Sequence, residues 1–189
     1  MLPTFELNTH SNILNDLVEG CKKEDRLCQE KLYKLFYPAL FSLCKLFFDD
    51  NHEALSSLNN GMLQVFKNIG SYNEEKGSLF NWMYTLVRNS ALTQLRNKKS
   101  IFQMHQLPEG IELPAKENLF KTLESKDFYI TFSYLPQSTR AVCKLFYIDD
   151  FSVKEIAMQL QISEGTIKWH LSEGRKQLKI ILQKSMTII

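Results

Sequence analysis

The side chains of this chain that could do chemistry point to recognition rather than to bond making. The four histidines and four cysteines are scattered without metal-site spacing, and no phosphate-binding glycine loop or nucleophile with a neighbouring base is present. Between residues 163 and 176, in contrast, hydroxyl, aromatic, acidic and basic side chains alternate at helical spacing. Such side chains hydrogen-bond base edges and hold phosphates. We therefore predict a DNA-binding protein that is not an enzyme and uses no metal or cofactor.

Two short helices joined by a tight turn position these side chains. Ser152 followed by Glu155 is a capping-box pattern, so a helix is predicted to begin at Val153. The turn falls at residues 161–162, and Ser163 caps a second helix. The apolar stripe of this second helix comprises Ile167, Leu171, Gly174, Leu178, Ile181 and Leu182. The pattern indicates a helix-turn-helix, although an amphipathic hairpin with merely solvated charges gives the same spacing.

The second helix carries the candidate contacts to duplex DNA. In a helix-turn-helix, the first residues of this helix reach base edges while flanking cations hold phosphates. The predicted contacts to bases are Thr166, Trp169, Ser172 and Glu173. The predicted contacts to phosphates are Lys168, His170, Arg175 and Lys176, with Ser163 at the start of the helix.

Composition indicates a globular protein of the cytoplasm. The 189 residues are 44% hydrophobic and 23% charged, enough for one large or two small domains. The formal net charge is only +2, but residues 80–100 carry Arg88, Arg96, Lys98 and Lys99 and no acid, so a basic patch is local. The cysteines are expected to be buried and reduced. We find no signal peptide and no run that could insert into a membrane.

Helical spacing dominates the chain and strand signals are nearly absent, so we predict an all-α fold. Apolar stripes indicate helices near residues 32–47 and 54–69; Pro38 would kink or break the first, and Gly70 ends the second. Ser78 caps a third helix that reaches about Arg96. From residue 98 to 122 the pattern dissolves, which predicts a flexible linker. Two helical domains are therefore expected, over residues 1–97 and 123–189.

The third helix combines an apolar face with an outer face of aromatic, amide and cationic side chains. Amides and arginines hydrogen-bond nucleic acid, and aromatic rings stack on exposed bases. The candidate residues in and before this helix are Tyr72, Phe80, Asn81, Trp82, Tyr84, Arg88, Asn89 and Arg96. A helix buried on both sides would show the same periodicity, and Trp82 shares an arc with Met83 and Leu86 that suits a core residue.

Both halves together resemble the extracytoplasmic-function (ECF, group IV) sigma factors of bacterial RNA polymerase, from about residue 17 to 182. The motifs in the second half that resemble the family's fourth conserved region are Leu135-Pro136, Arg140, Glu155-Ile156-Ala157, Ile162-Ser163 and Gly165-Thr166-Ile167-Lys168. Those in the first half that resemble its second conserved region are Trp82-Met83-Tyr84, Val87-Arg88-Asn89, Ala91-Leu92 and Arg96. The second-half motif alone also resembles regulators of the LuxR type.

The resemblance implies two promoter contacts and a polymerase contact. By similarity, residues 54–69 bind the clamp helices of core RNA polymerase, residues 71–96 read and open the minus-ten element as single-stranded DNA, and the helix from Ser163 reads the minus-thirty-five element. The implied polymerase contacts are Ser56, Ser57, Asn59 and Asn60. These replace the acidic and glutamine-bearing stretch usual in the family. Many relatives are held by an anti-sigma factor, so such a partner is expected too.

Two other functions stay open at this point. The first is a LuxR-like DNA-binding regulator that acts without polymerase. The second is a sigma-like interaction protein that titrates another factor, which the missing acidic residues suggest. The matches in both halves favour the sigma factor.

Overall fold

The computed structural model describes residues 4–98, 100–103 and 131–186, and within them all regular elements are helices. The predicted all-α fold is confirmed. Most of the predicted linker, from residue 104 to 122, lies outside the described residues. The chain forms two compact units: unit 1 comprises 1–44 and 52–91, and unit 2 comprises 45–51 and 92–189.

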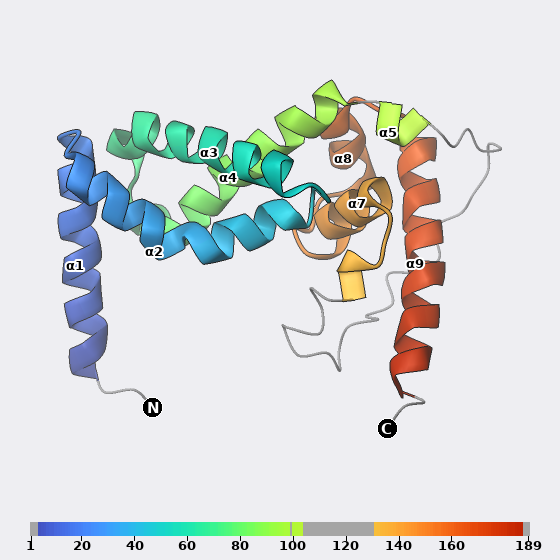
Figure 1. The fold of residues 1–189 in the computed structure, drawn as a ribbon, viewed down its shortest axis with the longest axis horizontal. Helices are drawn as coiled ribbons and strands as arrows, with labels where there is room; N and C mark the ends of the chain where they lie inside the picture. Colours follow the sequence, from blue (N-terminus) through green and yellow to red (C-terminus); the bar gives the residue numbers. More distant parts are fainter. Residues whose placement is uncertain (1–3, 99, 104–130, 187–189) are drawn as a thin grey trace. The chain divides into compact units, whose positions relative to one another are not determined.

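Unit 1 is built from the α-helices of the first half of the chain (Figure 1). They are α1 (Thr4–Lys22), α2 (Arg26–Lys45), α3 (Asn51–Asn68) and most of α4 (Leu79–Asn97). The short 3-10 helices η1 (Ile69–Ser71) and η2 (Glu74–Lys76) connect α3 to α4. The sequence predicted a kink or a break at Pro38, but α2 continues through this residue. The side chains at the core of unit 1 include Leu32, Leu40, Leu58, Met62, Val65, Met83 and Val87.

A glycine sets how closely α3 approaches α4. Gly61 is buried, and a Cβ atom added to it would lie 2.7 Å from the Cα of Val87 and 2.8 Å from its Cγ2. One turn away, the Ser90 hydroxyl donates to the carbonyl oxygen of Ser57 at 3.1 Å. Any side chain at position 61 would push the two helices apart. The glycine that looks unfavourable for an isolated helix is therefore required by the packing.

Unit 2 contains α5 (Ser100–Gln103), α7 (Gln137–Tyr147), α8 (Val153–Leu160) and α9 (Glu164–Met186) (Figure 1). α9 packs against both α7 and α8. Gly174, on the apolar stripe of α9, permits the close approach to α7, because an added Cβ would lie 2.3 Å from the Cys143 sulfur. Burial raises the pKa of the Cys143 thiol to about 12, so it stays protonated.

One face of α7 holds the segment Lys45–Asn51, which belongs to unit 2. Arg140 is only 3% exposed; its guanidinium donates to the Leu46 carbonyl at 3.0 Å and pairs with Asp49. Lys144 is fully buried, with its Nζ 2.6 Å from Asp149 and 4.7 Å from the centre of the Phe47 ring. Each of these cations meets an acid, which offsets the cost of its burial.

Candidate nucleic-acid interface

The helix-turn-helix of α8 and α9 begins and turns where the sequence predicted. The Ser152 hydroxyl accepts from the Glu155 amide at 3.2 Å while the Glu155 carboxylate accepts from the Ser152 amide at 2.8 Å. The Ser152 hydroxyl also donates to the Glu155 carboxylate at 2.6 Å, and this bond, together with the one from the Ser152 amide, holds the pKa of Glu155 below its usual range. Gln161 takes a left-handed conformation with φ of 55° and ends α8. Ser163 then accepts from the Thr166 amide at 3.0 Å, which starts α9.

The predicted DNA contacts on α9 differ in exposure. Lys176 is exposed and Ser163 caps the helix at the surface. Five further candidates are half-buried: Thr166, Lys168, Trp169, Ser172 and Glu173. The Glu173 carboxylate accepts from Gln177 at 2.7 Å, so reading a base would require this bond to be exchanged.

Two of the predicted phosphate contacts have other partners. His170 is 1% exposed, its Nδ1 lies 3.0 Å from the Thr139 hydroxyl, and its ring meets Phe102 edge-on. The structure therefore contradicts the phosphate contact predicted for His170, because packing of α9 on α7 buries it. Arg175 is half-buried and donates to the Tyr147 hydroxyl at 3.1 Å, which fastens α9 to α7.

On α4, two half-buried rings and a cation follow one another at four-residue spacing, and the first ring, Phe80, also stacks on Phe36 of α2 with centroids 6.0 Å apart. Phe80 and Tyr84 have ring centroids 6.0 Å apart, and the Arg88 guanidinium lies 5.9 Å from the centre of the Tyr84 ring. Asn81 and Asn89 are exposed, whereas Trp82 is half-buried and packs on Tyr72 with centroids 5.6 Å apart. Near the end of α4, Arg96 donates to the Thr93 hydroxyl at 3.2 Å. The Trp82 side chain is thus neither fully buried in the core nor fully exposed to solvent.

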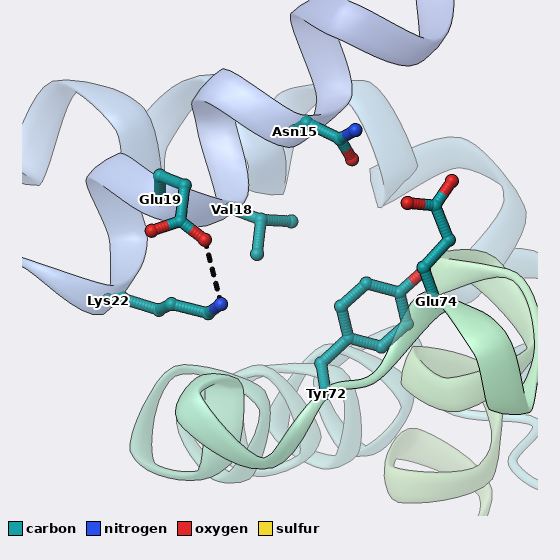
Figure 2. A pocket seen from close by; sticks show the side chains of 6 residues that line it. All are labelled: Asn15, Val18, Glu19, Lys22, Tyr72 and Glu74. Carbon is teal, nitrogen blue, oxygen red and sulfur yellow. Dashed lines mark hydrogen bonds and ion pairs between the residues drawn. The ribbon is translucent and has the colours of Figure 1, made fainter.

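Tyr72 also closes a small polar cavity against α1. The cavity has a volume of about 260 Å³ and is lined by Asn15, Val18, Glu19, Lys22, Tyr72 and Glu74. Figure 2 shows Tyr72 and Glu74 facing α1, where Lys22 pairs with Glu19 at 2.7 Å. The hydrogen bond and the charge of Lys22 hold the pKa of Glu19 below its usual range.

The side chains predicted to contact polymerase from α3 differ in their exposure to solvent. Ser56, Asn59 and Asn60 are exposed, but Ser57 is fully buried against α4. The structure contradicts the contact predicted for Ser57, because its position in the helix faces the core. Sequence reasoning also missed the aromatic residues of α2 beside this face, Tyr33, Tyr37 and Phe41. Their spacing of four residues was the available signal.

Comparison with known families separates the sigma factor from the LuxR-like regulator. The profile of Sigma-70 region 2 matches residues 32–101, and that of Sigma-70, region 4 matches residues 131–178. The ECF RNA polymerase sigma factor SigW of Bacillus subtilis is 25% identical over 176 residues, which cover 86% of this chain and 92% of SigW. The chain belongs to the Sigma-70 family of sigma factors. The region 2 match is what a LuxR-like regulator would lack.

Other relatives share the same class. The ECF RNA polymerase sigma factor SigM of Bacillus subtilis is 22% identical over 159 residues, covering 83% of this sigma factor and 96% of SigM. A solved structure of the sigma factor RpoE with the anti-sigma factor NepR from Bartonella quintana is 21% identical. The match covers 82% of this chain and 96% of the RpoE chain, with a TM-score of 0.43.

As a sigma factor, this protein binds core RNA polymerase and directs promoter recognition and transcription initiation. α3 and α4 lie within region 2, and α7, α8 and most of α9 lie within region 4. No described helix is long and apolar enough to cross a membrane.

Proposed function

We propose that this chain is a group IV sigma factor in which region 2 binds polymerase and opens the minus-ten element while region 4 locates the minus-thirty-five element. It acts in the cytoplasm as an initiation factor without catalytic activity of its own. The proposed domains are residues 1–97 for region 2 and residues 123–189 for region 4, joined by a linker over residues 98–122. An anti-sigma factor is proposed as a further partner on the resemblance to regulated relatives.

The observation that carries the opening role is the row of rings and cation on α4. Separating DNA strands costs roughly 1–2 kcal/mol per base-pair step. Stacking one exposed base on an aromatic ring returns about 1–3 kcal/mol. Phe80, Tyr84 and Arg88 adjoin one another on one helix, and Asn81 and Asn89 are exposed beside them. These side chains supply the stacking and hydrogen bonding that offset a few opened steps.

For region 4, the proposed reader is the first half of α9. The proposed base contacts are Thr166, Trp169, Ser172 and Glu173, and the proposed phosphate contacts are Lys168 and Lys176. Arg175 is proposed to position α9 on α7 through Tyr147 rather than to hold a phosphate. The Ser163 cap leaves the amide end of α9 ordered, which supports its entry into a major groove.

The test combines the purified protein with core polymerase and a promoter library. Specific initiation is expected, with permanganate-reactive thymines appearing at the minus-ten element. Arg88→Ala should lower open-complex formation by about tenfold, the equivalent of one lost stacking or cationic contact. Lys34→Ala is the matched control, because Lys34 is a surface cation on α2 paired with Glu30. It should leave opening unchanged.

Each failure has a distinct meaning. Binding to core polymerase without initiation at any promoter would favour a protein that titrates another factor. Tight duplex binding with no polymerase association would favour the LuxR-like regulator. Equal opening by Arg88→Ala and wild type would refute the role given to the outer face of α4.

A further inference from the structure

The ring of Trp169, one of the proposed base contacts on α9, lies against the ring of the next residue. Trp169 and His170 have ring centroids 4.8 Å apart, and their planes meet at 74°. Adjacent side chains on a helix point about 100° apart and do not normally face each other. Since His170 is only 1% exposed, this contact means that the indole is turned toward the buried side of α9, which agrees with its half-buried state.

The His170 ring is itself held by two other helices of unit 2. Its Nδ1 lies 3.0 Å from the hydroxyl of Thr139 on α7, and Thr139 is buried. On α5, the Phe102 ring meets the imidazole edge-on, with centroids 5.9 Å apart and planes at 90°. Edge-to-face contact at this separation is a favourable arrangement of aromatic rings. The hydrogen bond and the ring contact together give the imidazole one orientation, so it is a fixed support for the indole.

The Thr139 side chain serves the packing of α7 on α9 and the hydrogen bond to His170 with different atoms. Its Cγ2 methyl group would lie 3.0 Å from a Cβ added to Gly174, so the methyl group packs where α9 comes close. Its hydroxyl is the group that meets His170. Valine at this position keeps a methyl group and removes the hydroxyl, whereas serine does the reverse. The two roles can therefore be separated by substitution.

We propose that His170 is a positioning residue for promoter recognition: held by Thr139 and Phe102, it fixes the orientation in which the Trp169 ring meets the minus-thirty-five element. This inference rests on the proposed base contact of Trp169. Contacts to base edges discriminate only when the side chain is held at a defined position in the groove. His170 is buried and acts on sequence preference through the neighbouring indole, without touching DNA.

The size of the effect follows from the orientations that the indole could adopt without this support. A side chain has roughly three staggered orientations about its first torsion. If one of them reads the base, the competent fraction falls to about a third, and the affinity for the preferred sequence falls about threefold. Sequences that the indole does not favour lose nothing by this change. The discrimination supplied by Trp169 should therefore fall by about threefold, whereas removing the ring should abolish it.

The experiment measures binding of the full-length chain, assembled with core polymerase, to promoters with a randomised minus-thirty-five element. Trp169→Ala should remove a preference of about tenfold at the positions that the indole contacts. Thr139→Val should lower the preference at these same positions by about threefold and leave the other positions unchanged. Thr139→Ser is the matched control: it keeps the hydroxyl and should keep the wild-type preference. A merely structural role of Thr139 would weaken binding to all sequences alike.

A second measurement needs no DNA. The chain has two tryptophans, so Trp169 is the only one in a Trp82→Phe background. Its fluorescence anisotropy decay should gain a fast local component in Thr139→Val and should not gain it in Thr139→Ser. If Thr139→Val does not fold, His170→Gln takes its place. It keeps an amide that can bond Thr139, removes the ring that supports the indole, and should give the same losses.

The outcomes separate the two levels of inference. Wild-type preference and wild-type anisotropy decay in folded Thr139→Val and His170→Gln, with a loss of preference in Trp169→Ala, would overturn the role of His170 and leave the proposed function standing. Unchanged preference in Trp169→Ala would remove the base contact and the inference with it. Absence of any minus-thirty-five preference in the wild-type complex would instead refute the proposed function of region 4.

Discussion

Replacing Gly61 by alanine tests whether the close approach of α3 and α4 organises region 2. The added methyl group would lie 2.7 Å from the Val87 Cα, 2.8 Å from its Cγ2 and 3.1 Å from its Cβ. Carbon atoms prefer separations of about 3.5–4.0 Å, so the helices must move apart by close to 1 Å. The nearest of these atoms belongs to the backbone, which cannot rotate away as a side-chain end can.

Two effects of opposite sign decide the magnitude. Alanine stabilises a helix interior by about 1 kcal/mol relative to glycine. Overpacking a well-filled core costs about 1–3 kcal/mol, and a backbone clash belongs at the upper end of that range. We therefore expect Gly61→Ala to lower the free energy of unfolding of unit 1 by about 1–2 kcal/mol. The clash outweighs the gain in helix propensity.

The assay is urea unfolding followed by tryptophan fluorescence in a Trp169→Phe background, so that Trp82 reports on unit 1. With a slope of about 2 kcal/mol per molar urea, the middle of the usual range, the midpoint should fall by roughly 0.5–1 M. Gly70→Ala is the control, because nothing lies within 4 Å of the added Cβ; its midpoint should not fall. A Gly61→Ala midpoint equal to or above wild type would refute the packing argument.

Four further outcomes are expected. Ser152→Ala should lower the unfolding free energy by about 1 kcal/mol, measured in urea, since it removes the cap of α8. Because the folded pKa of Glu155 is depressed, its stabilisation is present above its ordinary pKa and lost as pH falls through the folded pKa; a pH series of melting temperatures should show this loss in wild type and a smaller one in Ser152→Ala. Lys176→Ala should weaken binding to every minus-thirty-five sequence and reduce its salt dependence, whereas Glu173→Ala should change which sequence is preferred, both measured by binding to a sequence library. Cys143, whose pKa burial raises to about 12, should resist thiol reagents in the native state and react on unfolding, as counted by mass spectrometry; reaction in the native state would contradict its burial.

Helix ends were predictable because their causes are local. The Ser152 and Glu155 cap, the turn at Gln161 and the Ser163 cap each depend on bonds between residues at most four positions apart. Such short-range bonds form in the same way in any fold that accommodates the helix.

Burial of individual side chains was less predictable. His170 and Ser57 occupy positions that the sequence allowed on a surface, yet each faces a neighbouring helix. Helical periodicity gives the direction of a side chain around its own axis. It does not say which arcs a second or third helix will cover, and α9 is covered by both α7 and α8.

The sequence by itself determined the all-α class, the helix-turn-helix with its caps, and the two regions that identify a sigma factor, because these follow from spacing and short-range hydrogen bonds. Only the tertiary structure paired Arg140 with Asp49, 91 positions apart, and joined Tyr33 to Asn59 across two helices. It also showed that Gly61 is needed for contact with Val87. Partners so distant in sequence are chosen by packing and the satisfaction of buried polar groups, which depend on the whole fold.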